Sequence, residues 1–254
     1  MDILVTGGAG FIGSNLIKSL VKKYPNSNII SVDNYFTGKK DNHIDSPNIT
    51  YLDISVTEYL DGGVRVIPEI VYHFGEYSRI VKSFDDIDYL IETNLYSTSK
   101  LIEKCKQWGS KIIYSASSSK FGNEGKDENL SPYAWVKAKM VELIKNYGIW
   151  YGLNYEIVYF YNVYGYGQIE YGDYATVIGI FTTYQNLNHE WYLRSGQPKT
   201  IIEVANLFGE WTMVDKRRGE RQTADIVKND TQQLLGWVPK NTIEDYILTI
   251  KNTL

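Results

Sequence analysis

The feature that most constrains the fold is a glycine-rich segment directly after the first apolar run. Residues 2–6 (DILVT) lead into TGGAGFIG, in which Gly7, Gly10 and Gly13 give the spacing GxxGxxG. Glycine at these positions allows a tight strand-to-helix turn, close approach of the backbone to a phosphate, and close packing of helix on strand. The helix that follows offers N–H donors and partial positive charge at its N-terminus. The segment therefore predicts a βα unit that binds the pyrophosphate of a dinucleotide.

An acidic residue, Asp33, ends the second apolar run, about 20 residues beyond the glycine loop, as in dinucleotide-binding folds. A carboxylate at this place accepts hydrogen bonds from the ribose hydroxyls and repels a 2′-phosphate. It therefore favours NAD over NADP, although Lys39 and Lys40 nearby keep NADP open as an alternative.

Apolar runs alternate with amphipathic stretches as far as residue 165, and the pattern then becomes irregular. Such alternation is typical of βαβ units, in which helices cover both faces of a parallel sheet. Strands are predicted at 2–6, 28–33, 50–53, 70–74, 111–117 and 156–161, and helices at 11–24, 87–107, 132–151, 200–208 and 242–252. The expected fold is α/β, a Rossmann-type doubly wound parallel sheet over residues 1–165 with a small, reduced C-terminal lobe over 166–254.

Composition excludes several classes of partner. The net charge of −4 argues against a nucleic acid or an anionic membrane, because no basic excess exists to neutralise phosphates. Cys105 is the only cysteine, and His43, His73 and His189 are dispersed, so neither a disulfide within one chain nor a metal site is expected. Without a signal-peptide pattern or an apolar run of about 18 residues, we expect a cytoplasmic protein.

A second set of polar residues points to catalysis. Tyr133 and Lys137 are four residues apart on a predicted helix, so both project from one face. A tyrosine acts as a general acid or base only if its ordinary pKa of about 10 is brought toward neutrality, and a neighbouring ammonium favours the phenolate. Upstream, the predicted strand 111–117 ends in SASSS, which places hydroxyls at the sheet edge where such folds bind ligands.

A YxxxK pair alone can be a solvated pair, particularly in a chain with 22 tyrosines. The order of the features favours the catalytic interpretation. The phosphate loop, the acidic strand end and the hydroxyl-rich strand end precede YxxxK in turn.

With these features the sequence resembles the NAD-dependent epimerase/dehydratase family, the extended short-chain dehydrogenase/reductases typified by UDP-glucose 4-epimerase. The resemblance covers nearly the whole chain. It is carried by VTGGAGFIGSNL (5–16), VDNYFTG (32–38), YLDI (51–54), YHFGEYSRI (72–80), Asn94, SASSSKFG (115–122), SPYAWVK (131–137), FYNVYG (160–165), and the later segments 188–209, RRGE (217–220) and LLGWVPK (234–240).

The resemblance implies roles for individual positions. The catalytic residues would be Ser117, Tyr133 and Lys137, with NAD as the cofactor. The cofactor would be held by Gly7, Gly10, Phe11, Ile12, Gly13, Asp33, Asn34, Asp53, Ile54, Phe74, Gly75, Glu76 and Lys137. A nucleotide-sugar substrate would contact Ser118, Asn162 and Arg217, although a solvated surface arginine is the alternative for Arg217. The lobe 166–254 would be the substrate-binding lobe, partly interleaved with the first domain.

The activity that the resemblance implies is epimerisation of a nucleotide sugar through a keto intermediate that is reduced again on its other face. The family's 4,6-dehydratases carry Asp-Glu where this chain has Ser118 and Ser119, so dehydration is disfavoured, and Ser119 also argues against decarboxylation. A nucleotide-sugar dehydrogenase or reductase remains an alternative, because the same catalytic residues serve both reactions.

The sequence departs from the family pattern most where residue 185 is followed closely by residue 188. Relatives have a substantially longer segment there, which contributes to the grip on the nucleotide diphosphate. The stretch between Ser117 and Tyr133 is also short, and Tyr159 replaces an arginine. An internal deletion is the hypothesis, and a catalytically impaired NAD-binding protein is a further alternative. The helices near 90–107 and 133–150 resemble the family's dimer interface, so a homodimer is expected.

Overall fold

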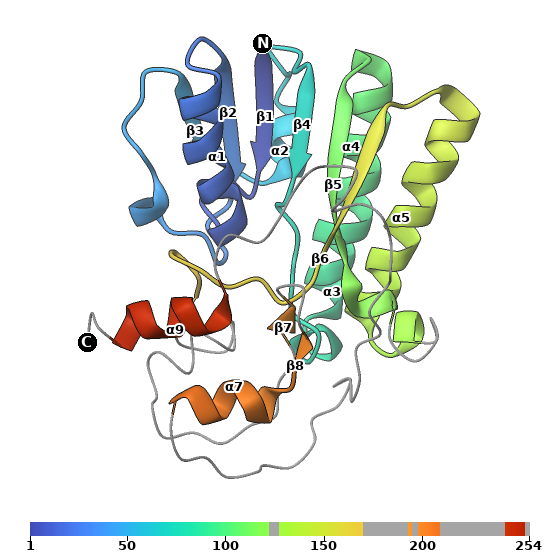
Figure 1. The fold of residues 1–254 in the computed structure, drawn as a ribbon. Coiled ribbons are helices and arrows are strands. Elements are labelled where there is room, and N and C mark those ends of the chain that lie inside the picture. The colour runs from blue at the N-terminus through green and yellow to red at the C-terminus, as the bar shows by residue number, and fades with distance from the viewer. Residues whose placement is uncertain (122–126, 170–192, 195–197, 209–241, 252–254) are drawn as a thin grey trace.

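The computed structural model describes residues 1–121, 127–169, 193–194, 198–208 and 242–251 (Figure 1). These residues form a six-stranded sheet in the order β3-β2-β1-β4-β5-β6, in which every pairing is parallel. The strands are β1 (Asp2–Thr6), β2 (Asn28–Asp33), β3 (Ile49–Asp53), β4 (Ile70–His73), β5 (Lys111–Ser117) and β6 (Tyr155–Phe160). The predicted doubly wound Rossmann-type sheet is confirmed, with strand boundaries that differ from the predicted ones by at most one residue.

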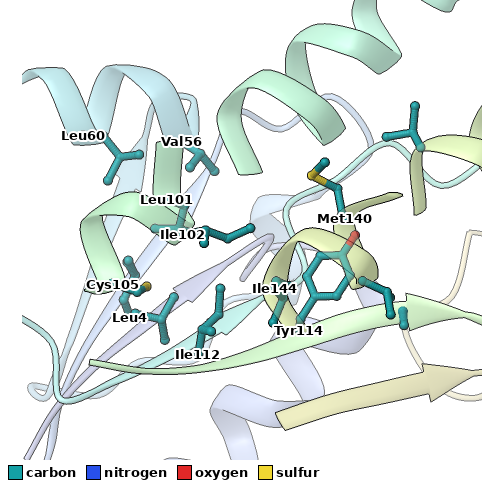
Figure 2. Packing of buried hydrophobic residues seen from close by; sticks show 14 of the residues in the cluster. Leu4, Val56, Leu60, Leu101, Ile102, Cys105, Ile112, Tyr114, Met140 and Ile144 are labelled. Atoms are coloured by element: carbon teal, nitrogen blue, oxygen red, sulfur yellow. The ribbon is translucent and has the colours of Figure 1, made fainter. Parts of the chain in front are cut away.

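The central strand β1 is buried on both faces, as a parallel sheet requires. Leu4 packs into the core that α2 (Val56–Asp61), α4 (Ser97–Trp108) and α5 (Pro132–Tyr151) cover. Its neighbours Ile3 and Val5 point the opposite way, into the core beneath α1 (Phe11–Lys23). Figure 2 shows the first of these cores, where Leu4 and Ile112 from the sheet meet Leu101, Ile102 and Cys105 from α4.

The helix predicted at 87–107 is a continuous helical run with an irregular middle. It consists of α3 (Ile87–Leu90), a π-helical turn (Ile91–Tyr96) and α4. The short helix α2 was not predicted from the apolar pattern. Its signal is a capping box, in which the Ser55 hydroxyl accepts from the Glu58 N–H and the Glu58 carboxylate accepts from the Ser55 N–H.

Beyond β6 the described residues include a short hairpin of β7 (Leu193–Arg194) and β8 (Pro198–Lys199), and the helices α7 (Ile201–Phe208) and α9 (Ile243–Lys251). Val204 and Ala205 of α7 pack against Ile243 and Ile247 of α9. Both helices lie beyond the end of the sheet toward which the strand arrows point in Figure 1. None of the helices in the described ranges is long and apolar enough to cross a membrane.

Candidate active site at the carboxyl edge of the sheet

The register of the sheet brings three polar side chains into one row. Thr6 of β1 pairs with His73 of β4, and His73 pairs with Tyr114 of β5. Thr6 and His73 are the last residues of β1 and β4, at the edge where open α/β sheets bind ligands, and Tyr114 lies midway along β5. This row forms the floor of the candidate site.

The glycine loop has the geometry that a phosphate-binding turn needs. Gly7 has a φ of +71°, and a Cβ there would lie 2.7 Å from the backbone nitrogen of Gly75. A Cβ on Gly13 would lie 2.1 Å from the carbonyl oxygen of Gly7, so the start of α1 can approach the loop only through glycine. Gly10 caps α1 without a side-chain hydrogen bond, which leaves the helix N-terminus open to an anion. These residues therefore fit a dinucleotide pyrophosphate.

Asp33 is tied to the glycine loop by its carboxylate. It accepts the Ala9 N–H at 2.9 Å and the Tyr35 N–H at 2.8 Å, and Tyr35 adopts a left-handed φ of 55° to make that contact. Burial raises the pKa of Asp33, while the hydrogen bonds from Tyr35, Ala9 and Gly10 act in the opposite direction. These three donors leave about one of the four lone-pair sites of the carboxylate, so a ribose hydroxyl can still be accepted.

The other residues predicted near the adenine lie around Asp33. The Asn34 amide donates to the Tyr89 hydroxyl at 3.0 Å, Asp53 lies 3.5 Å from the Lys40 ammonium, and Ile54 packs on the main core. The Lys40–Asp53 pair is exposed, so it stabilises the loop weakly.

Ser117 and Tyr133 lie on neighbouring elements. Ser117 ends β5, and its hydroxyl accepts the Ser119 N–H at 3.2 Å at the start of the 3₁₀ turn Ser118–Lys120. Ser118 and Ser119 are buried, and the Ser119 hydroxyl has no hydrogen-bond partner among the residues that the structure describes. Helix α5, which carries Tyr133, packs against both β5 and this turn. Its first turn is fixed by Ser131, whose hydroxyl accepts the Ala134 N–H at 3.1 Å, and by Pro132.

Lys137 and Glu76 form a buried ion pair at the centre of the site. The Lys137 ammonium donates to the Glu76 carboxylate and to the Ser115 carbonyl, and it lies 4.7 Å from the centre of the Tyr114 ring. The side chains of Lys137 and Glu76 are 6% and 2% exposed. The sequence predicted Glu76 beside the cofactor and did not predict this partner.

Three further residues lie around this pair, and the sequence had named only Asn94 among them, as part of the family resemblance. The Thr98 hydroxyl donates to Glu76 at 3.0 Å, the Tyr114 hydroxyl does so at 3.1 Å, and Asn94 binds the backbone of Tyr77. Burial, followed by the charge of Glu76, raises the pKa of Tyr114 well above its usual range. Thr98 and Tyr114 were missed, and the sequence signal for Thr98 is a polar side chain on the apolar face of α4.

The predicted sugar-nucleotide residues are placed in part. Asn162 lies on the exposed segment after β6, whereas Arg217 lies outside the described residues. The same segment returns to the glycine loop, because a Cβ on Gly165 would lie 3.5 Å from the Phe11 ring and the Tyr166 carbonyl accepts from the Asn15 amide at 3.0 Å. Within the ranges that the structure describes, no group of three or more His, Cys, Asp or Glu residues could hold a metal ion.

The fold and the loop together define a dinucleotide-binding protein of the Rossmann class. Residues 3–221 match the model of the NAD dependent epimerase/dehydratase family, and the chain belongs to that family. NAD is the cofactor of this family.

Curated relatives fall into more than one activity. The chain is 34% identical over 191 residues to a Methanocaldococcus jannaschii protein named for UDP-glucose 4-epimerase activity, an alignment that covers 70% of this chain and 61% of that protein. It is 32% identical over 182 residues to UDP-glucuronic acid decarboxylase 6 of Arabidopsis thaliana, with coverage of 65% and 51%. The chain thus spans between half and three fifths of the length of these relatives.

Solved structures share the fold. The UDP-glucose 4-epimerase of Thermotoga maritima, solved with UDP-glucose, superposes with a TM-score of 0.86 at 24% identity and covers 100% of this chain and 98% of its own. The Thermus thermophilus UDP-glucose 4-epimerase, solved with NAD, gives a TM-score of 0.83 at 22% identity, with coverage of 99% and 98%.

Proposed function

We propose that this chain is an NAD-dependent nucleotide-sugar epimerase. The observation that carries the proposal is the placement of Tyr133 and Lys137 one turn apart on α5, both buried, beside the hydroxyl-bearing end of β5. A tyrosine that is held beside an ammonium and next to a serine hydroxyl can move a proton to and from a sugar hydroxyl.

The residues after Ser117 favour epimerisation over elimination. Removing water or carbon dioxide from a sugar needs a second proton-transfer group, and positions 118 and 119 are serines. Among the described residues, the Glu76 carboxylate is 2% exposed and already binds Lys137, Thr98 and Tyr114, so it is not free to serve as that group. Decarboxylases and dehydratases also occur among the relatives, and the serines at 118 and 119 support epimerisation over both of these reactions.

In the proposed mechanism the residues of the chain bind and orient the cofactor and the substrate, and they move one proton. The glycine loop and the N-terminus of α1 hold the pyrophosphate, and Asp33 accepts from the adenosine ribose. Bound NAD supplies a hydride acceptor that later returns the hydride. Tyr133 takes the proton from the sugar hydroxyl as the carbon is oxidised and gives it back on reduction, while Ser117 hydrogen-bonds the reacting oxygen. Lys137 favours the phenolate of Tyr133 by its charge.

The test is incubation of the purified protein and NAD with UDP-, GDP- and dTDP-sugars, including UDP-glucuronic acid. Epimeric product without net NADH supports the proposal. Stoichiometric NADH would indicate a dehydrogenase, carbon dioxide a decarboxylase, and a 4-keto-6-deoxy sugar a dehydratase. Bound NAD with no turnover of any sugar would indicate the catalytically impaired alternative.

We further propose that residues 1–165 form the NAD-binding domain and 166–254 a reduced substrate-binding lobe that contributes Arg217. The hypothesised deletion between residues 185 and 188 lies outside the described residues, and it predicts weaker nucleotide-sugar binding than that of longer relatives. A calorimetric affinity equal to theirs would contradict it. A cytoplasmic homodimer is the expected state, and sedimentation of the purified chain tests the dimer.

A further inference from the structure

The Lys137–Glu76 ion pair has partners on every side. Glu76 accepts hydrogen bonds from Thr98 and Tyr114 on one carboxylate oxygen and from Lys137 on the other, which also lies 3.4 Å from the Ser115 hydroxyl. Lys137 donates to Glu76 and to the Ser115 carbonyl, and its remaining contacts, with the Tyr114 and Ser115 hydroxyls, are longer at 3.5 Å. One ammonium N–H is therefore only weakly engaged.

A series of hydrogen bonds leads from Thr6 through His73 and Thr98 to this carboxylate. Thr6 accepts the N–H groups of Phe74 and Gly75 on its hydroxyl oxygen, so its own proton points to Nδ1 of His73 at 2.7 Å. The neutral imidazole then carries its proton on Nε2 and donates to Thr98 at 2.8 Å. Because Thr98 accepts from His73, its hydroxyl proton is available to Glu76. Every donor in this series thus points toward Glu76, which suits an ionised carboxylate because it only accepts hydrogen bonds.

We propose that Glu76 is a positioning residue for Lys137: its carboxylate holds the ammonium charged and directed toward Ser115, with one N–H left for the cofactor ribose. The catalytic consequence rests on the proposed function, whereas the ion pairing itself does not. The titratable groups around the pair are Tyr114 from β5 and His73 from β4, and Tyr133 from α5 and Tyr159 from β6 lie near Tyr114. His73 is neutral in this arrangement.

The carboxylate changes what Lys137 can do for Tyr133. A buried ammonium without a counter-ion loses its proton more readily, because desolvation disfavours the charged form. As long as it stays charged, however, it favours the phenolate of Tyr133 more strongly when no carboxylate offsets it. Both effects shift the pH dependence of the reaction to lower pH when the carboxylate is removed.

The first experiment compares the pH profile of kcat/KM for the wild type and Glu76→Gln. The amide keeps an oxygen for Thr98 and Tyr114 but presents a donor to Lys137. We expect both limbs of the profile to move to lower pH. A kcat/KM that falls by the same factor at every pH, with both limbs at their wild-type pH, would overturn the proposal. Glu156→Gln is the matched control, because it opens the exposed Lys111–Glu156 pair on the same sheet and should move neither limb.

The second experiment needs no activity and separates the two proposals. Unfolding by urea is measured for Glu76→Gln, Lys137→Met and the double variant. We expect the double variant to be more stable than either single one, because each single change leaves an unpaired buried charge. We also expect the deficit of Glu76→Gln to shrink as pH rises toward about 10, where the unpaired lysine is neutral in the folded chain.

The inference would be overturned if the losses of stability in the two single variants add up in the double variant and the loss in Glu76→Gln does not change with pH. This holds even if the wild type epimerises sugars. Conversely, a wild type without sugar turnover would overturn the proposed function and leave the non-additivity to be measured. If Glu76→Gln does not fold, folding of the double variant supports the inference, and failure of both the double variant and Lys137→Met contradicts it.

Discussion

Asn94 binds both backbone polar groups of Tyr77. Its amide oxygen accepts the Tyr77 N–H at 2.7 Å, and its amide nitrogen donates to the Tyr77 carbonyl at 2.7 Å. Asn94 is fully buried within the π-helical turn Ile91–Tyr96, and such turns redirect a side chain out of the regular helical repeat. Because Tyr77 follows Glu76 directly, this contact fixes the backbone next to the ion pair with Lys137.

Replacing Asn94 by Ala should destabilise the fold. The substitution removes two buried hydrogen bonds to the Tyr77 backbone, which costs about 1–3 kcal/mol in the free energy of unfolding. Urea denaturation measures it. Asn28→Ala removes an exposed amide that donates to Asp2, so it should change stability by less than about 0.5 kcal/mol. Equal losses in the two variants would contradict the role of Asn94.

Two glycines of the loop should separate stability from cofactor binding. A Cβ on Gly13 meets the Gly7 carbonyl at 2.1 Å, so Gly13→Ala should cost about 1–3 kcal/mol of stability. Gly10 has a φ of −76°, which alanine also adopts, and its Cβ would lie 3.2 Å from the same oxygen, so alanine there requires a much smaller shift than at Gly13.

Gly10→Ala should instead weaken NADH binding by about tenfold or more, because a methyl group then faces the pyrophosphate. NADH fluorescence titration and thermal unfolding, measured on both variants, test the contrast. NADH affinity unchanged in Gly10→Ala would remove this loop from the cofactor site.

Tyr133→Phe should abolish conversion of the sugar and leave NAD binding intact. Removing a general acid–base lowers kcat by about 10²–10⁴-fold, whereas the ring and the backbone contact to Ser83 remain. Tyr147→Phe is the matched control on the same helix. The Tyr147 hydroxyl binds Glu103, so removing it should leave kcat unchanged. Undiminished turnover in Tyr133→Phe would exclude Tyr133 from the reaction.

His73 should make the fold sensitive to acid. Burial lowers its pKa from 6.5 to about 4, although the charge of Glu76 opposes this. Between these two pH values the unfolded chain binds a proton that the folded chain does not, so stability falls as the pH drops through this window. The expected loss is about 3 kcal/mol.

His73→Gln should be less stable at neutral pH and should show a flatter dependence on pH between 6.5 and 4. Urea unfolding at several pH values measures the slope. His43→Gln is the comparison, since that ring is only partly buried and should affect the slope less. A wild-type slope retained in His73→Gln would show that other groups cause the acid sensitivity.

The fold was largely predictable because its signals are local. Six strands and five helices of the described residues can be read from apolar runs and helical spacing, since burial on both faces of a parallel sheet requires such runs. The short helix α2 was missed because it spans only Val56–Asp61, too few residues for a periodic pattern. The π-helical turn was missed because it leaves no periodic signal, and the contact of its Asn94 with Tyr77 is tertiary.

The sequence by itself determined the glycine loop, the acidic end of β2 and the YxxxK pair, because each depends on residues that are close in the chain. The partner of Lys137 was decided only by the tertiary structure. Glu76 lies 61 residues away, and it reaches the ammonium because β4 and β5 are neighbours in the sheet and α5 packs on β5. The state of His73 has the same origin, since its burial and its tautomer follow from Thr6 and Thr98, which the register and the packing of α4 bring to its two nitrogens.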